Sequence, residues 1–147
     1  MTTVLADARL GVMVADSALS DGDRQWSGRK VWRVKDELVG VAGDWSECLQ
    51  IFQWYKGGMR TTAPRFKNVS MLVLSPRGLV VMDQDLVPQA VDSGREAIGS
   101  GAKAAMCAYE ALAWKDPKRA VQIVCRHDAG SRAPVRVYSL KKHGSTR

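Results

Sequence analysis

The chain has 147 residues, of which 46% are hydrophobic and 25% charged, and this balance fits one globular domain, which we place at residues 1–140. No stretch reaches the roughly 20 apolar residues that a membrane-spanning helix needs, and the N-terminal residues lack the basic segment and apolar run of a secretory signal. We therefore expect a cytoplasmic protein. The formal net charge of +7 leaves an acidic partner open.

The first part of the chain alternates β-rich runs with turn residues. Strands are predicted at residues 3–8, 11–16, 30–34 and 38–42, which form two hairpins. Residues 17–28 are polar and include the turn chemistry of Ser20-Asp21-Gly22-Asp23, so we predict a loop there. After Gly43, apolar residues recur at helical spacing from Trp45 to Tyr55, and glycines at 57 and 58 predict the end of a helix.

The second part contains a third hairpin and two helices. Its strands are predicted at 69–74 and 78–82. The alanine-rich run 102–114 predicts a helix, and Asp116-Pro117 predicts the start of another that fades near 126–128. A closing strand at 134–140 precedes a basic tail at 141–147, which we expect to be disordered. Runs of strands and then helices favour an α+β domain of antiparallel sheets with helices on their faces.

The three cysteines, Cys48, Cys107 and Cys125, have neither C-x-x-C spacing nor paired histidines nearby. They indicate neither a disulfide framework nor a zinc site. Because Cys107 and Cys125 lie among apolar residues of predicted helices, we expect both thiols to be packed in the core. No nucleotide-binding loop and no G-x-S-x-G motif is present, and we expect no cofactor and no metal.

Six blocks of sequence resemble the proteasome β-subunit family, and within it the bacterial HslV peptidase most closely. In chain order they are Thr2-Thr3-Val4, Val14-Ala15-Asp16-Ser17, Lys30-Val31-Trp32-Arg33, Val39-Gly40-Val41-Ala42-Gly43, Ala97-Ile98-Gly99-Ser100-Gly101 and Asp128-Ala129-Gly130-Ser131. The resemblance spans nearly the whole chain. It implies an N-terminal-nucleophile hydrolase fold and a threonine peptidase acting on peptides or unfolded proteins.

The resemblance implies that Thr2 is the catalytic nucleophile once Met1 has been removed. A threonine hydroxyl needs a base to take its proton, and a free N-terminal amine, with a pKa of about 7.7–8.0, is such a base. By the same match, Lys30 lies beside Thr2 and favours the neutral amine and the ionised hydroxyl, and Asp16 holds Lys30. Without the Thr2 start, Asp16 and Lys30 would pass for a surface ion pair.

Further roles also follow from the resemblance. Gly43 matches the glycine whose backbone N–H faces the oxyanion of the tetrahedral intermediate. Ser100, Asp128 and Ser131 match polar groups that orient the amine and hydroxyl, although such residues also occur simply at helix ends. A substrate-binding role falls to Val41, which matches a position lining the pocket for the side chain before the scissile bond and suggests an apolar preference.

One departure from the family pattern concerns assembly. Family members carry a second helix after the first, whereas residues 57–68 contain two glycines, a proline and several basic residues. One helix is therefore expected to be missing, which puts the family's double ring in doubt. The resemblance otherwise implies a homo-oligomeric ring, with an ATP-dependent unfoldase as a possible partner.

Two other functions stay open at this level. A catalytically silent assembly protein with the same fold would retain Met1. A nucleic-acid-binding module would follow from the positive charge, yet the basic residues are scattered and no RNA-binding aromatic motif or zinc-finger spacing accompanies them. A solvated basic surface is the simpler explanation of this charge.

Overall fold

The computed structural model describes residues 2–21 and 23–141. Its strands are β1 (Val4–Asp7), β2 (Val12–Ala15), β3 (Ala18–Asp21), β4 (Arg24–Ser27), β5 (Val31–Val34), β6 (Glu37–Gly43), β7 (Val69–Ser75), β8 (Gly78–Met82), β9 (Gln89–Ala90), β10 (Arg95–Ile98) and β11 (Arg136–Ser139). Its helices are α1 (Trp45–Lys56), α2 (Ala102–Ala111) and α3 (Pro117–His127). The expectations about Met1 and about tail residues 142–147 lie outside the described residues.

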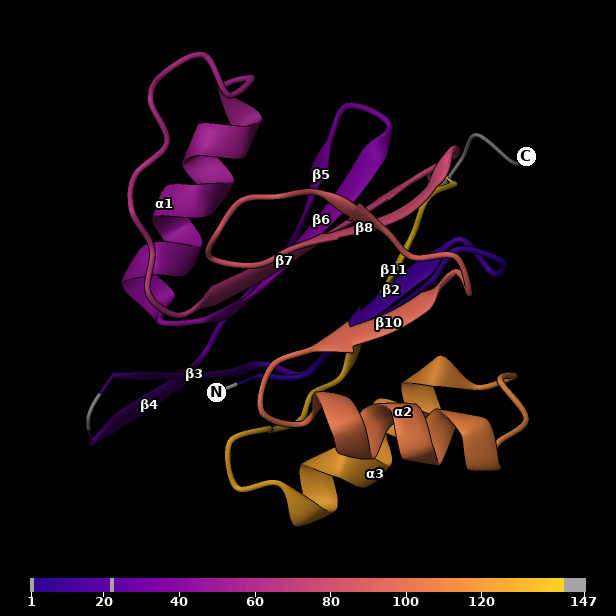
Figure 1. The fold of residues 1–147 in the computed structure, drawn as a ribbon. Coiled ribbons are helices and arrows are strands. Elements are labelled where there is room, and N and C mark those ends of the chain that lie inside the picture. The colour runs from indigo at the N-terminus through magenta and orange to yellow at the C-terminus, as the bar shows by residue number, and fades with distance from the viewer. Residues whose placement is uncertain (1, 22, 142–147) are drawn as a thin grey trace.

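Two antiparallel sheets face each other at the centre, and helices cover both outer faces (Figure 1). One sheet has the order β10-β1-β2-β11 and the other β5-β6-β7-β8-β9. Helix α1 packs on β6 and β7, while α2 and α3 pack on the other sheet. This arrangement confirms the predicted α+β sandwich of antiparallel sheets flanked by helices. The three hairpins predicted from turn chemistry are present as β1–β2, β5–β6 and β7–β8.

Strands β1 and β2 are buried on both faces because they lie between the second sheet and the helices. Val4 points into the core between the sheets, whereas the next residue, Leu5, points into the core under α2 and α3. The two sheets approach closely at Gly40, where a Cβ would lie 2.7 Å from Met13 Sδ and 2.8 Å from a Val4 methyl group. A glycine is therefore needed at this crossing.

One prediction from the sequence is wrong, and one strand was not predicted. Within the predicted loop 17–28, residues 18–21 and 24–27 pair as the strands β3 and β4, because Leu19 is buried and packs where a Cβ of Gly28 would lie. Residues 95–98, for which the sequence predicted no element, form β10, which pairs with β1 along its whole length. The charge of Arg95 makes this strand hard to recognise in the sequence. In the structure, the Arg95 guanidinium lies 4.7 Å from the centre of the Trp114 ring.

The three thiols differ in how deeply they are buried. Cys107 is exposed on α2 and Cys125 is half-buried on α3, so the expectation that both are packed in the core was wrong for Cys107.

The connection 57–68 contains turns and bends without a helix, as its composition predicts. The Trp54 indole donates a hydrogen bond of 3.0 Å to the Thr61 carbonyl and so holds this connection against α1.

Candidate active site

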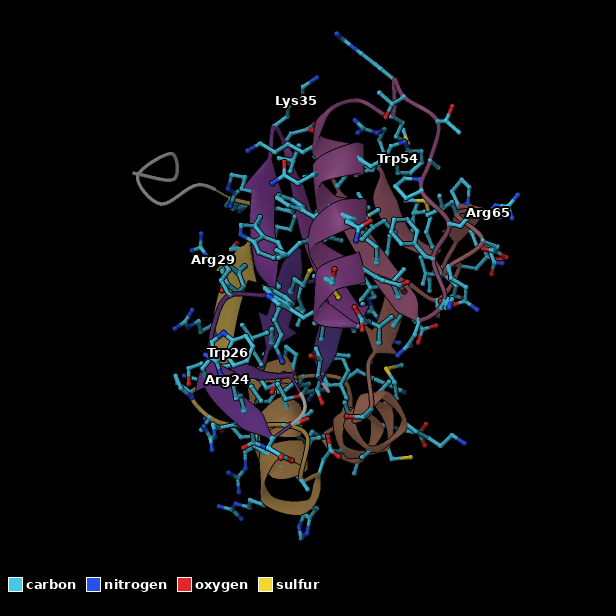
Figure 2. All side chains as sticks on the ribbon, turned by 90° about the vertical axis from the view of Figure 1, so that its left-hand side faces the viewer. Arg24, Trp26, Arg29, Lys35, Trp54 and Arg65 are labelled. Carbon is cyan, nitrogen blue, oxygen red and sulfur yellow. The ribbon has the colours of Figure 1, made fainter. Side chains whose placement is uncertain are left out.

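Thr2 lines a cavity of about 910 Å³ between the β3–β4 hairpin, the start of α1 and the connection from β10 to α2. Gly43 and Ser100 line the same cavity, so the structure brings three of the predicted site residues to one space. Other lining residues include Ser20, Trp26, Trp45, Leu49, Asn68 and Ser70. Figure 2 shows Trp26 on the hairpin beside Arg24, whose guanidinium lies 5.8 Å from the centre of the Trp26 ring.

The backbone of Thr2 is fixed by the glycines that precede α2. The Gly101 amide donates a hydrogen bond of 3.3 Å to the Thr2 carbonyl. A Cβ at Gly99 would lie 1.9 Å from that carbonyl oxygen, and the φ of +99° at Gly99 also favours glycine. The Gly-Ser-Gly sequence therefore allows the first residues of the chain to pass directly over the start of α2.

A fully buried ion pair joins Asp16, at the end of β2, to Lys30, just before β5. The Lys30 ammonium lies 2.7 Å from Asp16 Oδ1, and neither side chain is exposed. Burial lowers the pKa of Lys30 below its ordinary value, and the neighbouring Asp16 carboxylate partly opposes this shift. The structure thus brings these two residues together as a buried pair and not as a surface ion pair.

Asp16 also organises the backbone around the site. Its Oδ1 accepts the amide of Thr3 at 2.9 Å, and its Oδ2 accepts the amides of Ala18 at 3.0 Å and Arg132 at 2.9 Å. One carboxylate therefore joins the segment before β1, the β3–β4 hairpin and the segment that follows α3.

The three remaining polar residues gather around Thr3. The Thr3 hydroxyl lies 2.7 Å from Ser131 Oγ, and the hydroxyls of Ser131 and Ser100 donate to Asp128 Oδ2 at 2.6 and 3.0 Å. Burial alone would raise the pKa of Asp128, but the hydrogen bonds from Ser131, Ser100 and the Gly130 backbone, together with the positive charge of the chain's N-terminus, lower that pKa below its usual range. Sequence reasoning missed Thr3, and the paired threonines at the start are the signal that could have found it.

Gly43 occupies the last position of β6, where the backbone has a φ of +122°. A Cβ there would lie 2.3 Å from the Asn68 carbonyl oxygen. The Val41 amide donates to the Lys30 carbonyl at 3.1 Å. Because amides alternate along a strand, the Gly43 amide points to the same edge as that of Val41, beyond the end of β5 and toward the cavity.

The start of α1 is tied to the same corner. Asp44 caps the helix by accepting the Glu47 amide at 3.1 Å. The Glu47 carboxylate accepts the amides of Lys67 at 3.0 Å and Asn68 at 2.7 Å. The Asn68 carbonyl in turn accepts the Asp44 amide at 2.9 Å. This clamp holds the backbone around Gly43 independently of the rest of the 57–68 connection.

Val41 is not among the residues that line the cavity. It is buried in the core beneath α1, together with Val39 and Ile51. Trp45 and Leu49, both on α1, line the cavity and supply its apolar surface there.

Within the described residues, no group of three or more histidine, cysteine or acidic side chains is placed to hold a metal ion. The same part of the chain contains no helix that is both long and apolar enough to span a bilayer.

Comparisons with known proteins give a result at the level of structure. No protein-family model matches the sequence, and no curated protein matches it. The structure of eukaryotic HslV from Trypanosoma brucei is similar, with a TM-score of 0.77 and 22% identity over 93% of this chain and 98% of that chain. The chain has the HslV fold.

Two structures of BPH from Thiobacillus denitrificans share this HslV fold. One, in complex with epoxomicin, has a TM-score of 0.72 and 19% identity over 96% of this chain and 100% of that chain. The other has a TM-score of 0.68 and 18% identity over 96% of this chain and 99% of that chain. The fold expected from the sequence blocks is therefore confirmed.

Proposed function

We propose that this chain is an N-terminal threonine peptidase that cleaves peptides or unfolded proteins, with the Thr2 hydroxyl as nucleophile after removal of Met1. The observation that carries the proposal is the arrangement around one cavity. Thr2 and Gly43 line it, and the buried Lys30–Asp16 pair adjoins it through the Thr3 amide. The HslV fold supports the same assignment.

The reaction follows from these groups. The α-amine of Thr2 accepts the proton of the Thr2 hydroxyl, and the oxygen attacks the scissile carbonyl carbon. The oxyanion accepts a hydrogen bond from the Gly43 amide, a contribution of roughly 3 kcal/mol to the transition state. When the C–N bond breaks, the protonated amine gives its proton to the leaving amine and the acyl group remains on Thr2. Water, deprotonated by the same amine, then hydrolyses this ester.

The other predicted residues act by position and charge. Lys30 favours the neutral amine and the ionised hydroxyl through its positive charge, and Asp16 holds it in place. Ser100, Asp128 and Ser131 fix the Thr2–Thr3 backbone through the Thr3 hydroxyl. An apolar preference before the scissile bond rests on Trp45 and Leu49 rather than on the buried Val41.

The proposal extends to assembly and setting. We place the active form in a homo-oligomeric ring in the cytoplasm, with peptide or unfolded polypeptide as substrate. An ATP-dependent unfoldase would deliver folded substrates to such a ring. These points rest on the shared fold and are tested separately from catalysis, by the mass of the particle in solution and by copurification.

The decisive experiment is the intact mass of the full-length protein before and after incubation with epoxomicin. An active N-terminal threonine predicts loss of Met1 and one adduct per chain, because this epoxyketone reacts with both the hydroxyl and the free amine of such a residue. Thr2→Ala is expected to lose the adduct and all peptide cleavage. Thr62→Ala, at an exposed position of the 57–68 connection, is the matched control and should keep both.

A mature chain that retains Met1 and forms no adduct would overturn the proposal and favour the catalytically silent assembly protein. Cleavage that persists in Thr2→Ala would also overturn it. Circular dichroism of Thr2→Ala separates a lost nucleophile from a lost fold.

A further inference from the structure

A second cavity, of about 880 Å³, lies behind the polar residues of the candidate site. It is bounded by α3, by the β3–β4 hairpin and by the connection from α3 to β11, which passes beside that hairpin (Figure 1). The Ser17 amide, which donates to the Arg132 carbonyl at 2.8 Å, holds this connection against the hairpin. The volume is within the usual range for small-molecule and peptide sites.

The lining of this cavity is cationic. Lys118, Arg126 and Arg132 contribute to it, together with His127. Among the described residues, none of the three cations forms a salt bridge, and the Arg132 guanidinium donates a hydrogen bond of 3.2 Å to the Gln25 side chain. Asp128 is the acidic residue in the lining, and it accepts hydrogen bonds from Ser100 and Ser131.

This chemistry favours carboxylates over nucleic-acid bases. Arginine forks bind carboxylates through paired hydrogen bonds, and the net charge of +7 attracts acidic ligands at long range. Single-stranded nucleic acids are usually held by stacking of bases on aromatic rings. The lining contains no Phe, Tyr or Trp side chain within the described residues.

We propose that this second cavity binds an acidic peptide segment, through Lys118, Arg126 and Arg132, as a site separate from the one that contains Thr2. The two cavities share a hydrogen-bonded connection, because Ser100 lines the first, Asp128 and Ser131 line the second, and all three are linked. A ligand in the second cavity would thus alter the hydrogen bonds of the groups that position Thr2. This coupling rests on the proposed peptidase function, whereas binding itself does not.

Cysteine alkylation provides the test of binding, because Cys125 lines the second cavity and Cys107 is exposed on α2 outside it. Iodoacetamide labelling of both thiols is followed by mass spectrometry in full-length Thr2→Ala, with and without blocked hexaglutamate. Bound peptide should slow the labelling of Cys125 by about tenfold or more and leave Cys107 unchanged. Burial raises the pKa of Cys125 to about 11, so both rates are compared at one fixed pH.

Variants and alternative ligands make the result specific. Arg126→Gln combined with Lys118→Gln should abolish the protection, and Arg65→Gln, in the 57–68 connection, is the matched control that should keep it. Unchanged labelling at about 1 mM hexaglutamate would overturn the proposal. So would equal protection by hexaglutamine, by an oligothymidylate, or by raising the concentration of the protein alone, which would indicate a second copy.

Coupling is measured in the wild-type chain as the change in kcat/KM for a neutral fluorogenic peptide when hexaglutamate is added. We expect a change of about twofold or more that disappears in the Arg126→Gln, Lys118→Gln variant. Protection of Cys125 without any turnover would refute the peptidase function and leave the binding site intact. Turnover that is insensitive to a bound peptide would refute the coupling alone.

Discussion

The Lys30 ammonium lies 2.7 Å from the Asp16 carboxylate, with both side chains fully removed from solvent. Removing one member of a buried pair leaves the other charge uncompensated. Lys30→Met is therefore expected to lower the free energy of unfolding by about 3–5 kcal/mol, measured by urea denaturation. Arg77→Met, which removes an exposed cation, is the control and should cost less than about 1 kcal/mol. Similar losses in both variants would contradict the prediction.

Gly99 tests the close passage of the chain over the start of α2. Gly99→Ala would place a Cβ 1.9 Å from the Thr2 carbonyl oxygen, so we expect a large loss of stability and of the epoxomicin adduct. Gly78→Ala is the matched control, because Gly78 also has a positive φ but no atom within 4 Å of the added Cβ. Thermal unfolding should show that Gly78→Ala lowers the free energy of unfolding by about 1–2 kcal/mol, which is the cost of the positive φ for alanine. Equal losses would mean that contact with Thr2 contributes nothing.

The Asp128 carboxylate predicts a pH dependence. Because its pKa in the folded chain is lowered, Asp128 contributes stability above the ordinary aspartate pKa, and this is lost as the pH falls through the lowered value. Ser131→Ala removes one of the hydrogen bonds that cause the shift, so the pKa of Asp128 should rise. The difference in unfolding free energy between the wild type and the variant should then shrink in acid. Carbon-detected NMR titration of Asp128 measures the shift directly, with Ser46→Ala as the control.

Tyr109 and Asp7 form a second buried polar contact, at the far end of β1 from Thr2, where the Tyr109 hydroxyl donates to Asp7 Oδ2. Tyr109→Phe removes the hydroxyl partner of that carboxylate oxygen. The oxygen then keeps its ion pair with Arg95, at 3.5 Å. We expect a cost of about 1–3 kcal/mol in thermal or urea unfolding. Tyr138→Phe, in the edge strand β11, provides the control for a lost tyrosine hydroxyl. An unchanged midpoint for Tyr109→Phe would show that the contact is energetically neutral.

The elements that could be predicted from the sequence are those with strong local signals. Turn residues separate the strands of three hairpins, and Asp44 and Asp116 cap their helices as capping preferences lead one to expect. The β3–β4 hairpin has little apolar alternation, since β4 is exposed throughout, and its existence depends on packing of Leu19 against Gly28. Helix α2 is alanine-rich with a weak apolar face, so the sequence does not define which way Cys107 points.

The sequence predicts some features of the candidate site and misses others. Asp16 and Lys30 could be paired from the sequence by resemblance, and the structure brings them together. The orientation of individual side chains could not be predicted. Val41 lies on the face of β6 that α1 covers, whereas its neighbour Ala42 lines the cavity. The central place of Thr3 likewise depends on which of two adjacent threonines before β1 faces Ser131 and which one faces the cavity.

The clamp between Glu47 and the amides of Lys67 and Asn68 has a practical consequence. It fixes the entry to β7, while the Trp54 indole holds the connection near Thr61, so the stretch between these anchors is mechanically separate from the backbone at Gly43. Residues 62–65, without regular structure and exposed at Thr62 and Arg65, are accordingly the place where an affinity tag or a fluorescent reporter can be inserted. Such an insertion would label the molecule next to its first helix and leave both ends of the chain unmodified.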